Sequence, residues 1–202
     1  AQGQIINGMD ASTGIFGAGG FDQTLAILAL HNLNLPAPPE AVDALIASRI
    51  EDGSYAFTGE TTPGAGDSNT TAMAVMALAA VGRADELAPS IEYFRNTQNE
   101  DGGWTYQKPS QFGEDTDANS TALVIQALIA ASETPGAWET APNVTPFSAL
   151  LGLQNESGAF NFNLVFPGDN ALATIQAIPA LMNVSLDNLP VSVPVCRKLV
   201  WM

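Results

Sequence analysis

The feature that most constrains the fold is a recurring segment that is apolar on every face of a helix. Four such segments occur, at residues 21–32, 67–81, 117–132 and 169–183. A helix that is apolar all round has to be buried on all sides, whereas an amphipathic helix covers a core with one face. Segments of this second kind alternate with the first, at residues 38–49, 86–97 and 146–153. The alternation predicts an all-α fold with four inner and three outer helices.

A short turn with a glycine and an aromatic residue lies before each apolar segment. In register the four turns read TGIF (13–16), EDGSY (51–55), EDGGW (100–104) and ESGAF (156–160). Their spacing of roughly 40 to 56 residues is typical of helix-hairpin repeats with loops of variable length. We therefore expect one repeat domain at residues 21–183. A loop or the remnant of an earlier repeat precedes it at residues 1–20, and a C-terminal extension follows at residues 184–202.

Charge excludes two classes of partner. The 202 residues include 21 acidic and 6 basic ones, which gives a formal net charge of −15. Nucleic acids and anionic membranes bind through clustered Lys and Arg, so neither is expected as a partner. No apolar run approaches the ~20 residues that span a bilayer. The single cysteine, Cys196, allows no internal disulfide. The Lys-poor composition favours a secreted or cell-surface protein, and a cytoplasmic location stays open.

The strings QNEDGGW (98–104) and QNESGAF (154–160), each followed by a capped apolar helix, resemble the repeats of a known superfamily. It comprises squalene–hopene cyclases, terpene cyclases and protein prenyltransferases, and the likeness covers about residues 13–183. The resemblance implies a two-layer α/α-toroid, here an incomplete arc. In that family the glutamine caps a neighbouring helix and the aromatic ring stacks on the next repeat. Carried over, these structural roles fall to Gln98, Gln154, Phe16, Tyr55, Trp104 and Phe160.

The catalytic acid of the resembled cyclases has no counterpart at its position in this chain. In the cyclases of this family that protonate an alkene, the motif at the corresponding position is DxDDTA, and its middle Asp is the acid. Here the matching strings are DSNTTA (67–72) and DANSTA (117–122), with Asn69 and Asn119 at that position. An amide cannot donate the proton. Asp115 and Asp117 supply carboxylates at another offset and would be the catalytic residues of an enzyme.

Metal chemistry is weakly indicated. The zinc site of prenyltransferases is built from Asp, Cys and His, but His31 and Cys196 are the only residues of the last two types. A zinc site is therefore not expected, and His31 is interpreted as a helix-end histidine. The side chains of Asp115, Asp117 and Asn119 have the spacing of a calcium loop that lacks its Gly and distal Glu, so calcium is the candidate metal ion.

Acidic and amide residues gather at the starts of the apolar helices, where they would cap exposed N–H groups. If the inner helices run parallel, these residues form a rim at one end of the inner layer. The rim is either a mouth for a ligand or a cation, or a set of helix caps alone. Its members are Asp22, Asp67, Asn69, Glu114, Asp115, Asp117, Asn119 and Asp169.

An incomplete arc has consequences for function. Its open edges are apolar, which predicts self-association, a protein partner or missing N-terminal repeats. We expect a non-catalytic surface or secreted protein that acts as a binding or assembly scaffold. The alternatives are a terpene cyclase-like enzyme acting on a polyprenyl substrate and a binding protein for a small cofactor of the cobalamin type, whose carriers share this architecture. A deep aromatic-lined cavity with a buried carboxylate of raised pKa would favour the enzyme, and a filled core would favour the scaffold.

Overall fold

A computed structural model describes residues 5–189 of the chain, and within this range nearly all of the regular secondary structure is helical. The prediction of a helical fold is confirmed. Seven α-helices occur among the described residues, at Gly20–Asn32 (α2), Pro39–Ala47 (α3), Ser68–Ala80 (α4), Ala88–Thr97 (α5), Ala118–Ala130 (α6), Pro146–Leu151 (α7) and Ala171–Leu181 (α8). Short 3-10 helices lie at Ala84–Glu86 (η1), Pro135–Ala137 (η2) and Leu186–Asn188 (η3).

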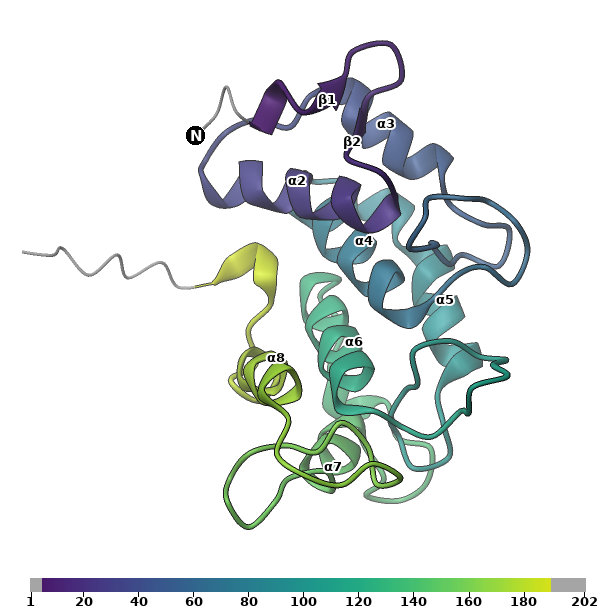
Figure 1. Cartoon of the computed structure of the whole chain (residues 1–202), viewed down its shortest axis with the longest axis vertical. Helices are drawn as coiled ribbons and strands as arrows, with labels where there is room; N and C mark the ends of the chain where they lie inside the picture. Colours follow the sequence, from purple (N-terminus) through teal and green to yellow (C-terminus); the bar gives the residue numbers. More distant parts are fainter. Residues whose placement is uncertain (1–4, 190–202) are drawn as a thin grey trace, which may run out of the picture.

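Four of these helices form a row in which each packs against the next (Figure 1). The order is α2, α4, α6 and α8, and these are the segments expected to be apolar all round. The amphipathic helices lie beside the row, with α3 against α2, α5 against α4 and α7 against α6. Helices α4 and α6 are buried along most of their length, from Thr70 to Leu78 and from Ala118 to Leu128. The core therefore lies between successive members of the row.

The helices of the row end in the same way. A residue with positive φ follows each one: Asn34, Gly82, Ser132 and Asn183. The next residue then donates its N–H back to a carbonyl five positions earlier, as Arg83 does to Leu78 at 2.9 Å. This Schellman arrangement satisfies carbonyls that a helix end leaves free. The same ending at all four helices indicates that they are copies of one structural repeat.

The helix starts differ in part from the expected caps. Asp67 and Asp117 cap α4 and α6 by accepting from the N–H groups of Thr70 and Ser120. Helix α8 is capped by Asn170 rather than by Asp169, so the expectation for Asp169 was wrong. Helix α2 follows Gly19, which has no side chain to cap with, and Asp22 in its first turn accepts from the N–H of Ala18.

Other differences lie near the ends of the described range. The N-terminal loop contains a hairpin of two short strands, Met9–Asp10 (β1) and Ile15–Phe16 (β2), which pair antiparallel and were not expected. Pro179 lies inside α8, which continues to Leu181. After α8 the chain turns back, and η3 packs on α2 and α4. There the carbonyl of Asp187 lies 3.0 Å from Nε2 of His31, which fits the helix-end interpretation. Cys196 lies outside the described residues.

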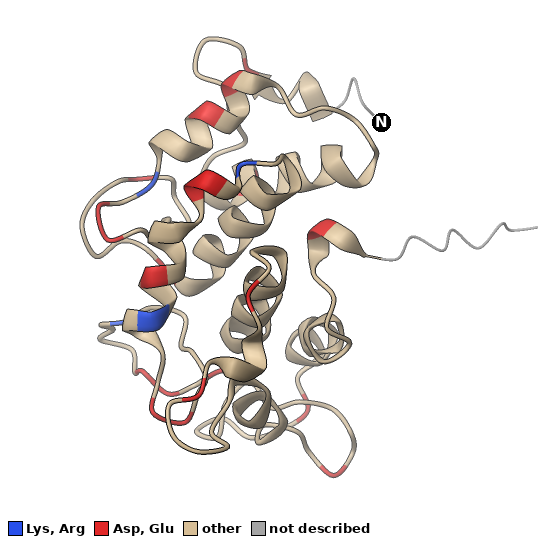
Figure 2. Ribbon diagram, turned by 180° about the vertical axis from the view of Figure 1, so that it is seen from behind, with Lys and Arg blue, Asp and Glu red and all other residues tan. Residues whose placement is uncertain are grey.

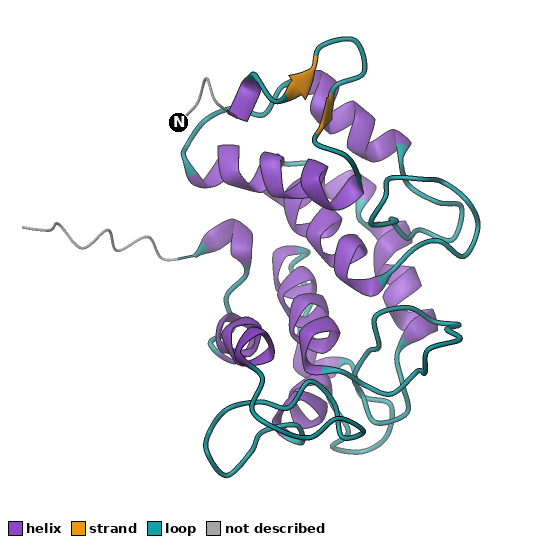
Figure 3. Ribbon diagram, in the orientation of Figure 1, coloured by secondary structure: helices purple, strands orange, loops and turns teal. Residues whose placement is uncertain are grey.

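Loops and charges are distributed unevenly. The long connections that precede α4, α6 and α8 lie on one side and at the lower end of the molecule in Figure 3. Acidic residues far outnumber basic ones on the ribbon in Figure 2, in keeping with the net charge of −15. Along α8, Leu172, Ile175 and Ile178 are exposed to solvent by 58%, 65% and 52%.

No helix within residues 5–189 combines the length and the apolar character that crossing a membrane requires.

Candidate functional site

A repeated hydrogen-bond unit joins each aromatic turn to the helix that follows it. The N–H of Trp104 donates to Oγ1 of Thr121 at 3.0 Å, and the N–H of Asp117 donates to the carbonyl of Trp104 at 2.9 Å. Two further units have the same bonds, formed by Tyr55, Asp67 and Thr71 and by Phe160, Asn170 and Thr174. In each unit the threonine lies four residues after the cap. The aromatic residue, the cap and the threonine therefore fix one another.

The second repeated contact runs to the preceding helix. The backbone carbonyl two residues after the turn aromatic accepts a hydrogen bond from an N–H at the start of the preceding row helix. Tyr106 accepts from the N–H of Ser68 at 2.7 Å, and Phe162 accepts from the N–H of Ala118 at 2.8 Å. Phe57 accepts from the N–H of Phe21 at 3.3 Å. Each turn thus holds the starts of two neighbouring row helices together.

These contacts create a pocket of about 430 Å³ between the helix starts, which we name the mouth pocket. Two repeated positions line it, one contributed by all four row helices and the other by three of the four turns. One lies two residues after the helix cap and the other two residues after the turn aromatic. Their members are Phe21, Asn69, Asn119 and Leu172, and Phe57, Tyr106 and Phe162. Thr70, Asp117, Ser120, Leu123, Asn170 and Gln176 complete the lining.

A second hollow of about 350 Å³ adjoins the mouth pocket, and we name it the side hollow. The two share Tyr106, Asp117 and Phe162 in their linings. Exposed apolar side chains border the side hollow, including Phe112 at 89% and Phe166 at 70%. The two hollows therefore offer one continuous surface that is rich in aromatic side chains.

Asp117 is the most unusual titratable group at the site. Its side chain is buried, and burial raises the pKa of the carboxyl to about 6 although hydrogen bonds from Ser120 act in the opposite direction. Both carboxylate oxygens accept from Ser120, one from its N–H and the other from its hydroxyl, each at 2.7 Å. The carboxyl of Asp117 therefore acts as a buried hydrogen-bond acceptor close to the pocket.

Asp67 and Tyr106 influence each other's ionisation. Burial raises the pKa of the Asp67 carboxyl. Burial, and then the negative charge of Asp67, raises the pKa of the Tyr106 phenol to about 12. The phenol therefore remains protonated at neutral pH. Two polar atoms that belong to lining residues, Oδ1 of Asn69 and Oγ1 of Thr70, are buried and have no hydrogen-bond partner among the described residues.

The expected rim is assembled only in part. Asp67, Asn69, Asp117 and Asn119 lie at or beside the mouth pocket, and Asp115 lines the side hollow. Glu114 instead accepts from the N–H of Ser110. Asp169 accepts from the side chains of Asn155 and Ser157. Asp22 bonds to the loop before α2.

The calcium candidates have other partners. Asp117 is occupied by Ser120, and the amide of Asn119 donates to Oε1 of Gln176. Within residues 5–189, no group of three or more His, Cys, Asp or Glu side chains is placed to hold a metal ion. Both carboxylate oxygens of Asp117 are thus already engaged, whereas a calcium loop directs such oxygens to the ion.

The glutamines and aromatic residues of the turns make structural contacts. Gln98 donates from Nε2 to the carbonyls of Gly102 and Trp138, at 2.9 and 3.1 Å, and so links its own turn to the next connection. Trp104 is fully buried, lies against Phe94 and Trp138, and donates from Nε1 to the carbonyl of Phe94. Gln154 donates only within its own turn, to the carbonyl of Gly158. Phe16, Tyr55 and Phe160 are buried in the same way.

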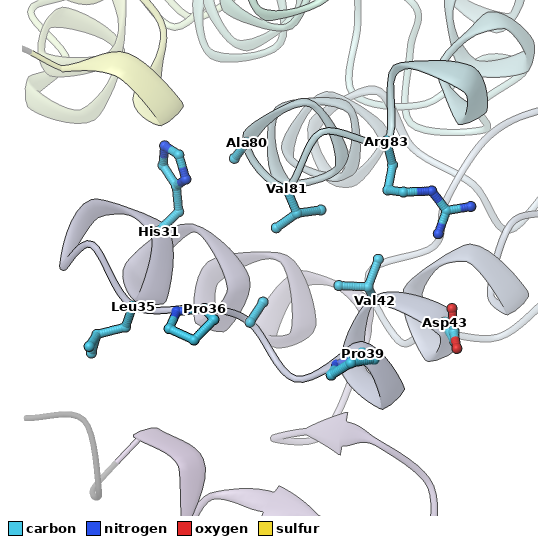
Figure 4. A pocket seen from close by; sticks show the side chains of 10 residues that line it. His31, Leu35, Pro36, Pro39, Val42, Asp43, Ala80, Val81 and Arg83 are labelled. Atoms are coloured by element: carbon cyan, nitrogen blue, oxygen red, sulfur yellow. The ribbon is translucent and has the colours of Figure 1, made fainter.

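Another hollow, of about 400 Å³, lies at the C-terminal ends of α2 and α4, away from the helix starts (Figure 4). His31, Val42 and Arg83 line it. Its basic groups already have partners, because Arg83 pairs with Asp85 and Glu86, and His31 contacts the carbonyl of Asp187. The mouth pocket, which holds unpaired polar atoms and several aromatic rings, is therefore the better candidate site.

The sequence predicted only part of the mouth pocket. It singled out Asn69, Asp117 and Asn119, but not Phe57, Tyr106 and Phe162. The signal was an aromatic–x–aromatic pattern in three of the turns, at YAF (55–57), WTY (104–106) and FNF (160–162). In an extended segment, residues two apart lie on the same side of the backbone. The repeat motif of the resembled family ends at the first aromatic residue of each turn, so it gives no role to the second.

A scan against protein-family models finds no match for this chain, and a search of curated proteins finds none either.

Proposed function

We propose that the chain is a non-catalytic binding module of the α/α-toroid type, whose ligand is a small molecule held in the mouth pocket. The observation that carries the proposal is the repetition of the lining: the same two positions of successive repeats face one pocket. A volume of about 430 Å³ lies in the range of small-molecule sites, which are mainly apolar with a few polar groups. A secreted or cell-surface location and an incomplete toroid arc belong to the same proposal.

The filled core supports binding rather than catalysis deep within the fold. Met73, Met76 and Leu128 fill the space between the row helices and are almost fully buried. The hollow lies at the helix starts, where solvent has access to Phe57 and Tyr106. A cyclase that protonates an alkene requires its acid in a site closed to water, because water would intercept the cation. A cobalamin-type cofactor remains within the proposed class of small-molecule ligands.

One observation favours the enzyme as a second candidate. Asp117 lines the pocket and has a pKa raised to about 6, as a general acid would. Its two oxygens, however, accept hydrogen bonds from Ser120, which favours the ionised form. The family's acid position is held by amides. Incubation with polyprenyl diphosphates, followed by product analysis, tests this candidate: a cyclised product that disappears in Asp117→Asn would replace the binding proposal.

Binding is tested with N-phenyl-naphthylamine, an uncharged fluorescent probe of apolar sites. The proposal predicts saturable binding of one probe molecule per chain. Tyr106→Ala removes a half-exposed ring from the pocket and should weaken binding by about tenfold, which corresponds to ~1.4 kcal/mol and lies within the ~0.5–1.5 kcal/mol of one aromatic contact. Leu33→Ala, at the other end of α2, is the control and should leave the affinity unchanged. Absence of saturable binding, or equal loss in both variants, would overturn the proposal.

The open edge of the row bears on partners. Helix α8 exposes Leu172, Ile175 and Ile178, which form an apolar face with no covering element among the described residues. We keep self-association, or a protein partner on this face, as part of the proposal because such faces are rarely left in water.

A further inference from the structure

Charge around the two joined hollows is of one sign. Asp115 and Asp117 are the charged residues in the two linings, and none of the described Lys, Arg or His residues joins them. The nearest basic residue in sequence, Lys108, donates to Oδ1 of Asn99 outside both linings. An anionic ligand would therefore meet negative charge and no cationic partner. With a net charge of −15, the whole molecule adds to the same potential.

Part of the hydrogen-bonding capacity of the helix starts is already used within the protein. An N-terminus normally attracts anions through its free N–H groups. Here several of those groups already have partners within the protein. The N–H groups of Ser68 and Ala118 donate to the carbonyls of Tyr106 and Phe162. Those of the third helical residue donate to the caps, at Thr70, Ser120 and Ala173.

Aromatic rings and unpaired acceptors complete the environment. Phe21 and Phe57 stack with ring centroids 5.6 Å apart, and Tyr106 and Phe162 line the same pocket. The faces of such rings attract cations. Oδ1 of Asn69 and Oγ1 of Thr70 can each accept a hydrogen bond, and Thr70 is fully buried. Neither atom has a hydrogen-bond partner among the described residues.

We propose that the mouth pocket recognises an organic ammonium group attached to an apolar body. The ammonium lies against the ring faces near Tyr106, close to the carboxylates of Asp115 and Asp117. The apolar body extends over the aromatic side chains that border the side hollow. This inference names the chemical class of the ligand and rests on the proposed function.

Three ligands with one phenylalkyl body test the inference by displacement of N-phenyl-naphthylamine. They are phenylbutylammonium, phenylbutanol and phenylbutanoate, which are cationic, neutral and anionic at neutral pH. The ammonium should bind about tenfold more tightly than the alcohol, the scale of one cation–π contact with a charge-assisted hydrogen bond. The carboxylate should bind most weakly. Raising the ionic strength should weaken binding of the ammonium and leave the alcohol unchanged.

Asp115→Asn removes one charge from the side hollow. Asp115 is exposed and caps no helix, so the fold should persist. Affinity for the ammonium should fall by about threefold, as expected for an exposed ion pair, while affinity for the alcohol stays the same. Asp43→Asn removes an equal charge from the hollow of Figure 4, away from the mouth pocket. It is the control and should change neither affinity.

The outcomes separate this inference from the proposed function. Equal affinity for the three ligands, or preference for the carboxylate, would overturn the ammonium inference while saturable binding of the naphthylamine probe upheld the binding function. Failure of every ligand to displace a bound probe would also overturn it. If the probe itself does not bind, both the function and the inference fail.

Discussion

Helices α6 and α8 begin alike but lie in different surroundings. Each has a polar cap, a threonine four residues later and the same pair of bonds to its aromatic turn. Helix α6 packs between α4 and α8, whereas α8 packs on α6 and leaves an apolar face exposed. Local sequence therefore determines how each helix starts. The number of neighbours determines whether its apolar faces are buried.

The largest expected difference concerns two isoleucines in the same register. Ile125 of α6 and Ile178 of α8 each lie eight residues after their cap, but Ile125 is fully buried and Ile178 is 52% exposed. Ile125→Ala should lower the free energy of unfolding by about 2–5 kcal/mol. Ile178→Ala should change it by about 0.5 kcal/mol or less in the monomer. Urea denaturation measures both, and equal losses would show that the free face of α8 is covered.

The caps of α6 and α8, Asp117 and Asn170, should differ in how their contribution to stability depends on pH. The pKa of Asp117 is raised in the fold from 3.8 to about 6, so the folded state holds the proton more tightly than the unfolded chain does. Stability from this group is present below pH ~4, declines as the pH rises toward 6 and is lost above it, by at most about 3 kcal/mol. Asp117→Asn keeps a polar cap, as Asn170 does on α8, and removes this dependence.

The difference between wild type and Asp117→Asn isolates that group, because Asp67 also has a raised pKa and contributes to the total. Unfolding curves between pH 4 and 7 should show a stability difference that changes with pH. Parallel pH profiles for the two proteins would contradict the raised pKa.

A smaller contrast is expected at the repeated threonines. Thr121→Val leaves the N–H of Trp104 without its acceptor in a buried site, at a cost of about 1–3 kcal/mol. Thr174 bonds to Phe160 in the same manner but is only half-buried. Thr174→Val should therefore cost about 1 kcal/mol or less, because water can replace the lost partner. Thermal unfolding followed by circular dichroism measures both, and the reverse order would argue against the shared unit.

The smallest effect on stability is expected on the free face itself. Ile175→Ser exposes no buried surface in the monomer and should alter the free energy of unfolding by about 0.5 kcal/mol or less. If the face mediates self-association, the same substitution should shift the population toward the monomer in analytical ultracentrifugation. A wild-type protein that is monomeric at all concentrations would refute self-association through this face.

The sequence predicted best the features that depend on residues close together in the chain. Periodicity located the row helices, and the caps at Asp67 and Asp117 follow from residue type and position. The cap of α8 was misplaced by one residue because Asp169 and Asn170 are both good caps, and only the backbone geometry distinguishes them. The mouth pocket was not predictable in full, since Tyr106 and Phe162 reach it through bonds to the preceding helix, which are contacts distant in sequence.

The central claim, that the helix starts form a ligand site, is tested most directly by mapping a ligand onto the protein. Phenylbutylammonium titrated into isotopically labelled protein should shift the side-chain amide signals of Asn69, Asn119 and Gln176, which line the mouth pocket. The backbone signals of Ile175 and Ile178 on the exposed face of α8 should stay unchanged. Shifts confined to Ile175 and Ile178, or no saturable shift at the helix starts, would contradict the claim.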